Sequence, residues 1–149
     1  MPPQPPFLLD TNVLVALIRR KELGGRIEQA YGVASNRGSA LISVVTVGEM
    51  FSLARQWSWP ENKVHELDSL LEDVICVDIS NEEILRAYGQ IHHFLIQRGN
   101  PIGDNDMWIA ATCAASGAIL LTTDKDFDPL DGTFIRRFWI DPRGSATQA

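Results

Sequence analysis

The chain has 149 residues, a length that suits one domain with a continuous core and no need for disulfides or a structural metal. Its 13 basic and 19 acidic residues give a net charge of −6, which argues against a protein that binds nucleic acid by bulk positive charge. This charge does not exclude a nuclease whose acids bind metal ions. No apolar run is long enough to cross a membrane, so we expect a soluble, cytoplasmic protein without a membrane segment.

The two ends of the chain differ in composition from the rest. Residues 1–6 contain four prolines, which disfavour a regular sheet or a helix interior, so this segment should be a flexible leader. Residues 143–149 should form a similarly flexible tail. One domain is therefore expected over residues 7–142.

Short apolar runs alternate with helical patterns along this domain. The apolar runs predict strands over residues 7–9, 40–43, 74–77, 119–122 and 138–140. Between them, helices are expected over residues 13–20, 25–35 and 46–57, and a fourth helix should begin at about Pro60. The fifth helix should run from a capping box formed by Ser80 and Glu83 to Gly99, and the sixth over residues 106–116. This alternation predicts an α/β fold: a parallel five-stranded sheet between helices, that is, a three-layer α/β/α sandwich.

Four separated acids lie where an apolar run ends or a helix begins: Asp10, Glu49, Asp106 and Asp124. A parallel sheet places the carboxyl ends of its strands along one edge, so these side chains are expected to converge there. Their mutual repulsion is tolerable only with cations or bound protons between them. Oxygen-only ligands favour Mg²⁺ or Mn²⁺ over zinc.

Each acid also has a purely structural explanation. Asp10 suits the N-cap of the first helix, and Glu49 completes a capping box with Thr46. Asp104 or Asp106 would cap the sixth helix, which leaves one of the two without a structural role. The run of acids from Asp124 onward could be a solvated loop. Taken together, however, capping and turn formation do not explain why acids recur wherever an apolar run ends or a helix begins.

The two cysteines do not have the spacing of a zinc or redox site. Cys76 lies in the third apolar run and Cys113 in the last helix, so both are expected to be buried, reduced thiols.

Four motifs, in order, are specific enough to identify a family. They are Leu9-Asp10-Thr11-Asn12, then residues 43–49 ending in Glu49, then residues 102–106 followed by Ile109-Ala110-Ala111, then residues 121–127 around Asp124. In content, order and spacing, this series resembles the PIN domains and, among them, the toxin nucleases of VapBC-type bacterial toxin-antitoxin pairs. The resemblance covers residues 7–142.

The resemblance implies one or two Mg²⁺ or Mn²⁺ ions at a cluster of acids. Asp10 and Asp106 would be the principal ligands, Glu49 would position a metal or its water, and Asp124 would complete the site. Asp104 and Asp126 are further candidate ligands. Asn12 and Thr123 would donate hydrogen bonds that orient the carboxylates or the metal-bound water.

The function that the resemblance implies is that of a metal-dependent ribonuclease toxin. Its substrate would be RNA and its partner a small antitoxin. Because such toxins often dimerise, a homodimer is expected. The alternative is a catalytically silent PIN-like module that binds RNA or protein, although all four acids are present. A phosphatase of the haloacid dehalogenase type is disfavoured because Asn12 stands where that type requires a second Asp.

Overall fold

The computed structural model describes residues 4–144. Of the predicted flexible leader (residues 1–6) and tail (residues 143–149), residues 1–3 and 145–149 therefore lie outside the described residues. Residues 4–6 form neither helix nor strand and lead into the first strand. The backbone N–H of Ile119 donates to the Pro6 carbonyl at 2.9 Å.

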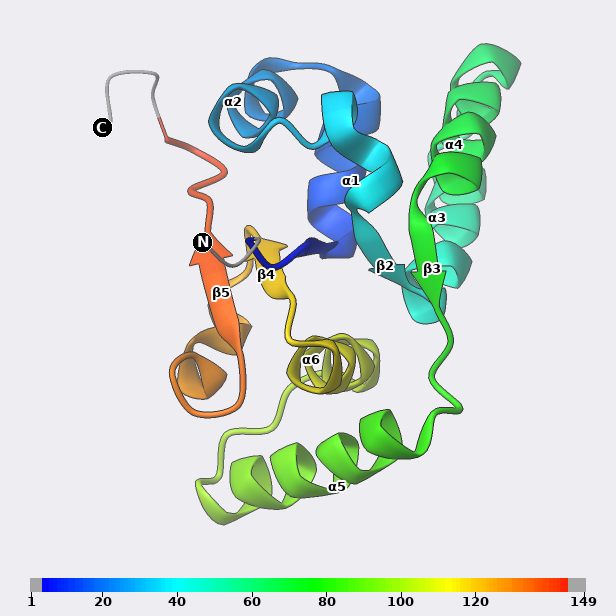
Figure 1. The fold of residues 1–149 in the computed structure, drawn as a ribbon. Helices are drawn as coiled ribbons and strands as arrows, with labels where there is room; N and C mark the ends of the chain where they lie inside the picture. The colour runs from blue at the N-terminus through cyan, green and yellow to red at the C-terminus, as the bar shows by residue number, and fades with distance from the viewer. Residues whose placement is uncertain (1–3, 145–149) are drawn as a thin grey trace.

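A parallel five-stranded sheet forms the centre of the molecule, as predicted (Figure 1). Its strands are β1 (Phe7–Leu9), β2 (Leu41–Ser43), β3 (Ile75–Val77), β4 (Ile119–Thr122) and β5 (Arg136–Trp139). Their spatial order is β3-β2-β1-β4-β5, so the chain winds outward from β1 in one direction and then returns to the other side of it. The carboxyl ends of β1 and β4 meet where this winding reverses, which is where open α/β sheets bind ligands.

Helices cover both faces of the sheet and complete the predicted three-layer sandwich. They are α1 (Thr11–Arg19), α2 (Glu22–Tyr31), α3 (Val44–Gln56), α4 (Glu61–Asp73), α5 (Glu82–Gln97) and α6 (Asp104–Ser116), with 3₁₀ helices η1 (Ala34–Ser39) and η2 (Lys125–Leu130). In Figure 1, α1 and α2 lie on one side of the sheet and α5 and α6 on the other.

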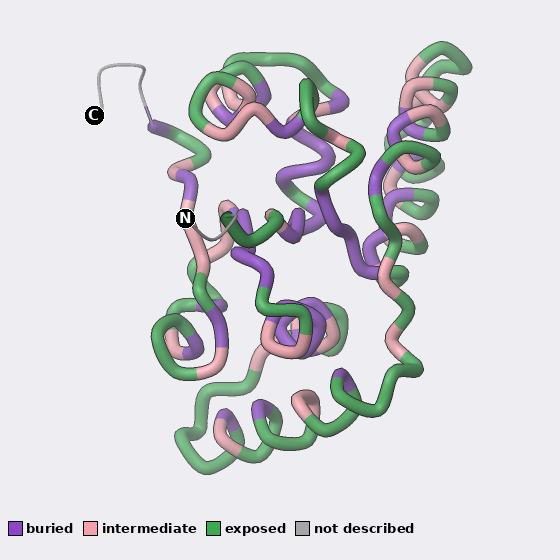
Figure 2. The backbone as a smooth tube through the Cα atoms, viewed as in Figure 1, coloured by how far each residue is buried: buried purple, intermediate pink, exposed green. Residues whose placement is uncertain are grey.

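Two apolar cores result, one on each face, and Figure 2 shows the central strands buried between the layers. Leu9 and Leu121 belong to the core with α1 to α4, whereas their neighbours Leu8 and Leu120 belong to the core with α5 and α6. Successive residues of a strand point to opposite faces, so a strand covered on both faces must be apolar throughout. This is why the central strands β1 and β4 are almost entirely apolar, whereas the edge strand β5 begins with Arg136 and Arg137.

The helix expected to begin at residue 25, after Gly24, was misplaced, because α2 begins at Glu22 and both Gly24 and Gly25 lie inside it. The chain turns earlier, at Arg20, whose φ of 54° is left-handed. Gly24 is instead the point where α2 approaches α1, since a Cβ atom there would lie 2.2 Å from the carbonyl oxygen of Ala16. The glycine therefore serves close packing and not chain reversal.

The predicted limits of the fifth strand and the fifth helix also need correction. β5 begins at Arg136, two residues before the predicted start, because it pairs with β4 from Ile119↔Arg136 to Thr122↔Trp139. At the start of α5 the cap is Asn81 rather than Ser80: its side chain accepts a hydrogen bond from the backbone N–H of Glu83 at 2.8 Å.

The cysteine prediction was half right. Cys113 is buried and Cys76 is exposed. Cys76 lies on β3, the edge strand that has only β2 as a neighbour, and the preceding Ile75 is 48% exposed. Within residues 4–144, no helix combines the length and the apolar character that crossing a membrane requires.

Candidate active site

Acidic side chains gather at the carboxyl edge of the sheet, where α1, α3 and α6 begin. Asp10 follows β1 directly, and its backbone N–H donates to the Leu121 carbonyl of β4 at 3.0 Å, which ties the two strand ends together. Asp124 follows β4 by one residue, and Ser43, the last residue of β2, is the N-cap of α3. Folding thus brings together acids that are more than a hundred positions apart in the sequence.

Asp10 is the most buried of these acids, with 3% of its surface exposed. As predicted, it caps α1: its Oδ1 accepts from the Thr11 backbone N–H at 2.8 Å, while its Oδ2 accepts from the Thr122 hydroxyl at 2.7 Å. Burial raises the pKa of Asp10 from 3.8 to about 6; these two hydrogen bonds oppose the rise, and the charges of Asp124 and Glu49 add to it. Capping of α1 therefore does not fully account for Asp10, because a helix cap does not need other negative charges beside it.

Glu49 is anchored differently from the capping box proposed for it. α3 begins after Ser43, whose hydroxyl accepts from the Val45 backbone N–H at 3.1 Å, so Glu49 lies inside the helix and the capping-box explanation was wrong. Its carboxylate accepts a hydrogen bond from the Thr11 hydroxyl at 2.7 Å. Thr11 thereby holds Glu49 beside Asp10.

The sixth helix begins at Asp104 with Gly103 as its N-cap, so neither Asp104 nor Asp106 caps it, contrary to expectation. Both lie in its first turn, but only Asp106 is half-buried, whereas Asp104 is exposed. The pKa of Asp106 is raised from 3.8 to about 7. Burial is the main cause, and the negative charges of Asp10, Asp124, Glu49 and Asp126 also contribute to the rise. The structure thus separates the two acids of this motif.

Asp124 and Asp126 complete the group, which we call the acidic cluster: Asp10, Glu49, Asp106, Asp124 and Asp126. Ligand oxygens of Asp106, Asp124 and Asp126 lie within 4.8 Å of one another. Asp124 also caps η2, because its carboxylate accepts from the Asp126 backbone N–H at 2.8 Å. These distances allow one small cation to touch all three carboxylates.

The hydroxyl groups that hold the cluster belong to residues that the sequence did not single out. Thr122 donates to Asp10 and accepts from the Asp124 backbone N–H at 2.9 Å, so it links two acids. Thr11 links Asp10 to Glu49. A hydroxyl residue within two positions of each strand-ending acid was the available signal: Thr11 directly follows Asp10, and Thr122 lies two positions before Asp124.

Asn12 and Thr123, the predicted donors, occupy other positions. Asn12 is exposed, and within residues 4–144 its side chain makes no hydrogen bond. Thr123 contributes its backbone carbonyl, which accepts from the indole N–H of Trp139 at 3.0 Å. A role for either side chain toward metal or substrate stays a prediction.

The donor set fits a hard divalent cation. It consists of carboxylate oxygens, as Mg²⁺ and Mn²⁺ prefer, and contains neither thiolate nor imidazole. Two pKa values raised by burial and by neighbouring negative charges indicate that the charged cluster is unfavourable by itself. A bound cation would relieve that repulsion.

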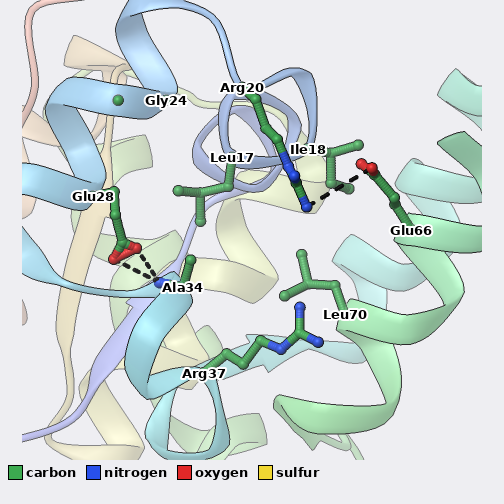
Figure 3. Close-up of a pocket in the computed structure, with 10 residues that line it drawn as sticks. Leu17, Ile18, Arg20, Gly24, Glu28, Ala34, Arg37, Glu66 and Leu70 are labelled. Carbon is green, nitrogen blue, oxygen red and sulfur yellow. Dashed lines mark hydrogen bonds and ion pairs between the residues drawn. The ribbon is translucent and has the colours of Figure 1, made fainter.

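Two hollows differ in their relation to the cluster. One, of about 280 Å³, lies at the far end of α1 between Leu17, Ile18 and Leu70, with Arg20 and Glu66 at its rim, and no residue of the acidic cluster lines it (Figure 3). The other, of about 480 Å³, is open and polar and includes Glu49 in its wall. It offers room for a chain that enters beside the acids.

The PIN-domain family model matches residues 7–132. Among characterised proteins, ribonuclease VapC1 from Haemophilus influenzae strain R2866 is 31% identical over 124 residues, which cover 81% of this chain and 89% of that protein. The tRNA(fMet)-specific endonuclease VapC from Shigella flexneri is 26% identical, covering 85% and 92%. The solved structure of DNA-bound VapBC from Salmonella typhimurium superposes with a TM-score of 0.74 at 23% identity, covering 91% of this chain and 98% of that one.

Proposed function

Because this chain belongs to the PIN-domain family and, within it, to the VapC ribonucleases, we propose that it hydrolyses RNA phosphodiester bonds at the acidic cluster with Mg²⁺ or Mn²⁺. It would act as the toxin of a toxin-antitoxin pair. The observation that carries the proposal is the convergence of Asp10, Glu49, Asp106 and Asp124 at the switch point of the sheet, where burial and the neighbouring negative charges raise the pKa values of Asp10 and Asp106.

The residues of the cluster divide the work. Asp10, Asp106 and Asp124 would hold the divalent ion, with Asp126 within reach of the last two. Glu49 borders the open hollow and, through its bond to Thr11, stays in a fixed position beside Asp10. When bound, the ion acidifies water and offsets negative charge on the phosphate.

The threonine hydroxyls supply the rigidity that such a site needs. Thr122 orients one Asp10 oxygen and the backbone of Asp124, and the Thr11 N–H orients the other Asp10 oxygen. Carboxylates fixed in this way do not have to reorganise when a cation arrives, which favours metal binding and catalysis.

We further propose that a small antitoxin inhibits the enzyme in the cytoplasm and that the toxin forms a homodimer. Structures similar in fold include a DNA-bound VapBC and a toxin-antitoxin complex from Klebsiella pneumoniae, which supports an antitoxin partner. A basic antitoxin side chain would compete with the metal for the same carboxylates.

The test is cleavage of two RNAs, one unstructured and one the tRNA(fMet) for which the Shigella relative is named. Wild-type protein with Mg²⁺ or Mn²⁺ is compared with the same protein in chelator and with Asp106→Asn. Asp104→Asn is the matched control, because Asp104 lies in the same helical turn but is exposed and does not contribute to the raised pKa of Asp106.

We expect cleavage that needs metal, that Asp106→Asn abolishes and that Asp104→Asn retains. Equal activity in Asp106→Asn would indicate a contaminating nuclease or a wrong site. Tight RNA binding without cleavage at any divalent metal would favour the silent binding module instead.

A further inference from the structure

A lysine and a tryptophan form a pair beside the acidic cluster. Lys125 directly follows Asp124, and its ammonium nitrogen lies 4.6 Å from the centre of the Trp139 ring. The ring is itself fixed, because its indole N–H donates to the Thr123 carbonyl at 3.0 Å. A cation over a tryptophan face is attracted by the ring, so the Trp139 indole holds the lysine at a defined place.

That place is the edge of the sheet where the acids gather. Trp139 is the last residue of β5 and the partner of Thr122 in β4, and the Thr122 hydroxyl donates to Asp10. Neighbouring strands lie about 4.8 Å apart, so the pair stands one strand away from the cluster. Asp124 and Asp126, on either side of Lys125 in the sequence, both belong to the cluster.

The charge of Lys125 is available to a ligand. Among residues 4–144 it forms no ion pair, although Asp124, Asp126 and Asp128 lie within three positions of it. Arg137, close by on β5, is in contrast paired with Asp128 at 2.7 Å. Lys125 is thus an exposed positive charge beside a strongly negative site, in a chain with a net charge of −6.

An RNA chain brings a negative charge at every nucleotide. A divalent ion held by the cluster would offset the charge of the phosphate that reacts, whereas the adjoining phosphates would need a cation of their own beside these acids. A lysine that rests on an indole keeps most of its hydrogen-bonding capacity, since its three N–H groups are not used by the ring.

We propose that Lys125 is a positioning residue whose ammonium ion contacts the RNA phosphate adjoining the one held at the acidic cluster. The inference rests on the proposed ribonuclease function and adds a determinant of substrate placement to it. Trp139 acts through Lys125 by fixing where the ammonium ion stands.

The same motif occurs elsewhere in the molecule and provides a matched control. Lys63 lies over the Trp59 ring at 5.4 Å, beyond the end of α3 that is remote from the cluster. Lys63→Met removes the same charge and the same kind of contact at a place remote from the acidic cluster. Lys125→Met is the test variant, and Lys125→Arg restores the charge.

The measurement is kcat/KM for RNA cleavage as a function of KCl concentration at a fixed, saturating Mn²⁺ concentration. We expect Lys125→Met to lose about tenfold in kcat/KM at low salt, mostly through KM, as fits one charged hydrogen bond. Loss of one phosphate contact should also make the slope of log(kcat/KM) against log[KCl] shallower by about 0.7. Lys125→Arg should recover most of both, and Lys63→Met should behave as wild type.

Thermal unfolding and Mn²⁺ titration of each variant separate this role from a structural one. An unchanged salt slope in Lys125→Met would overturn the inference, whether or not kcat/KM falls, and would leave the ribonuclease function standing. Absence of cleavage by the wild-type protein would instead remove the proposed function, and the inference with it.

Discussion

Replacement of Asp10 by Asn should stabilise the metal-free protein near neutral pH. The Asp10 side chain is 3% exposed, and burial is the main reason that its pKa rises from 3.8 to about 6. A rise of this size corresponds to about 3 kcal/mol against the folded state once the group is ionised. Asn has nearly the same shape and no charge, so it removes this cost.

Part of the gain is lost in a hydrogen bond. The Thr122 hydroxyl donates to Oδ2 of Asp10 at 2.7 Å and accepts from the Asp124 N–H at 2.9 Å. An Asn amide group facing that hydroxyl would replace an acceptor by a donor, at a cost of about 1 kcal/mol. The net gain is about 2 kcal/mol, which for a domain of this size raises the melting temperature by about 4–8 °C.

The sign of the effect depends on pH. Because the folded-state pKa of Asp10 is raised, its contribution to stability is fully present below the unfolded pKa of 3.8 and is lost as pH rises through about 6. The variant should therefore melt higher than wild type at about pH 8 in chelator, and slightly lower at about pH 4, where only the lost hydrogen bond remains. Addition of Mn²⁺ should raise the melting temperature of wild type more than that of the variant.

Thermal unfolding by circular dichroism, with both proteins in the same chelator-containing buffers, tests this. A melting-temperature difference that is the same at both pH values would refute the argument that burial of a charge sets the stability of this site. So would a variant that is less stable than wild type at about pH 8.

Three further outcomes are expected. Because the pKa of Asp106 is raised to about 7, protons should compete with the metal for its carboxylate. Calorimetry should therefore find weaker Mn²⁺ binding as the pH falls from about 8 to about 6. Equal affinities at both pH values would contradict the raised pKa. Thr122→Val should cost about 1–3 kcal/mol by denaturant unfolding and reduce cleavage, since it removes the hydroxyl that links two acids, whereas Thr122→Ser should retain both. Gly24→Ala should destabilise the fold by about 1–3 kcal/mol, because the added Cβ would meet the Ala16 carbonyl. Gly25→Ala, with open space around the added Cβ, should be neutral or mildly stabilising. Equal losses of stability in the two variants would contradict the packing argument.

The sheet was predictable from the sequence because its physics is local. Leu8 and Leu9, or Leu120 and Leu121, face opposite sides of a sheet that is covered on both, so their runs must be apolar. Strand order is different in kind, since it depends on how the whole chain packs. The exposure of Cys76 followed from the edge position of β3, which no property of residues 74–77 alone reveals.

The convergence of the acids was also predictable, but their individual surroundings were not. Parallel strands bring their carboxyl ends to one edge, which is enough to collect Asp10 and Asp124 there. To separate Asp104 from Asp106, one must know that α6 starts after Gly103, and helix starts are uncertain by one or two residues. The resemblance implied roles for Asn12 and Thr123, and only the structure shows that Thr11 and Thr122 donate hydrogen bonds to Glu49 and Asp10.

The winding of the sheet has a consequence for synthesis of the protein. β4 pairs directly with β1, yet within residues 4–144 it comes after β2, β3 and all six α-helices, and Asp124 and Asp126 come after it. A nascent chain that has emerged only as far as α6 has neither the strand that completes the central pairing nor these two carboxylates. For a ribonuclease toxin made on the ribosome, activity would thus arise only after β4 and the segment that carries Asp124 and Asp126 have been synthesised.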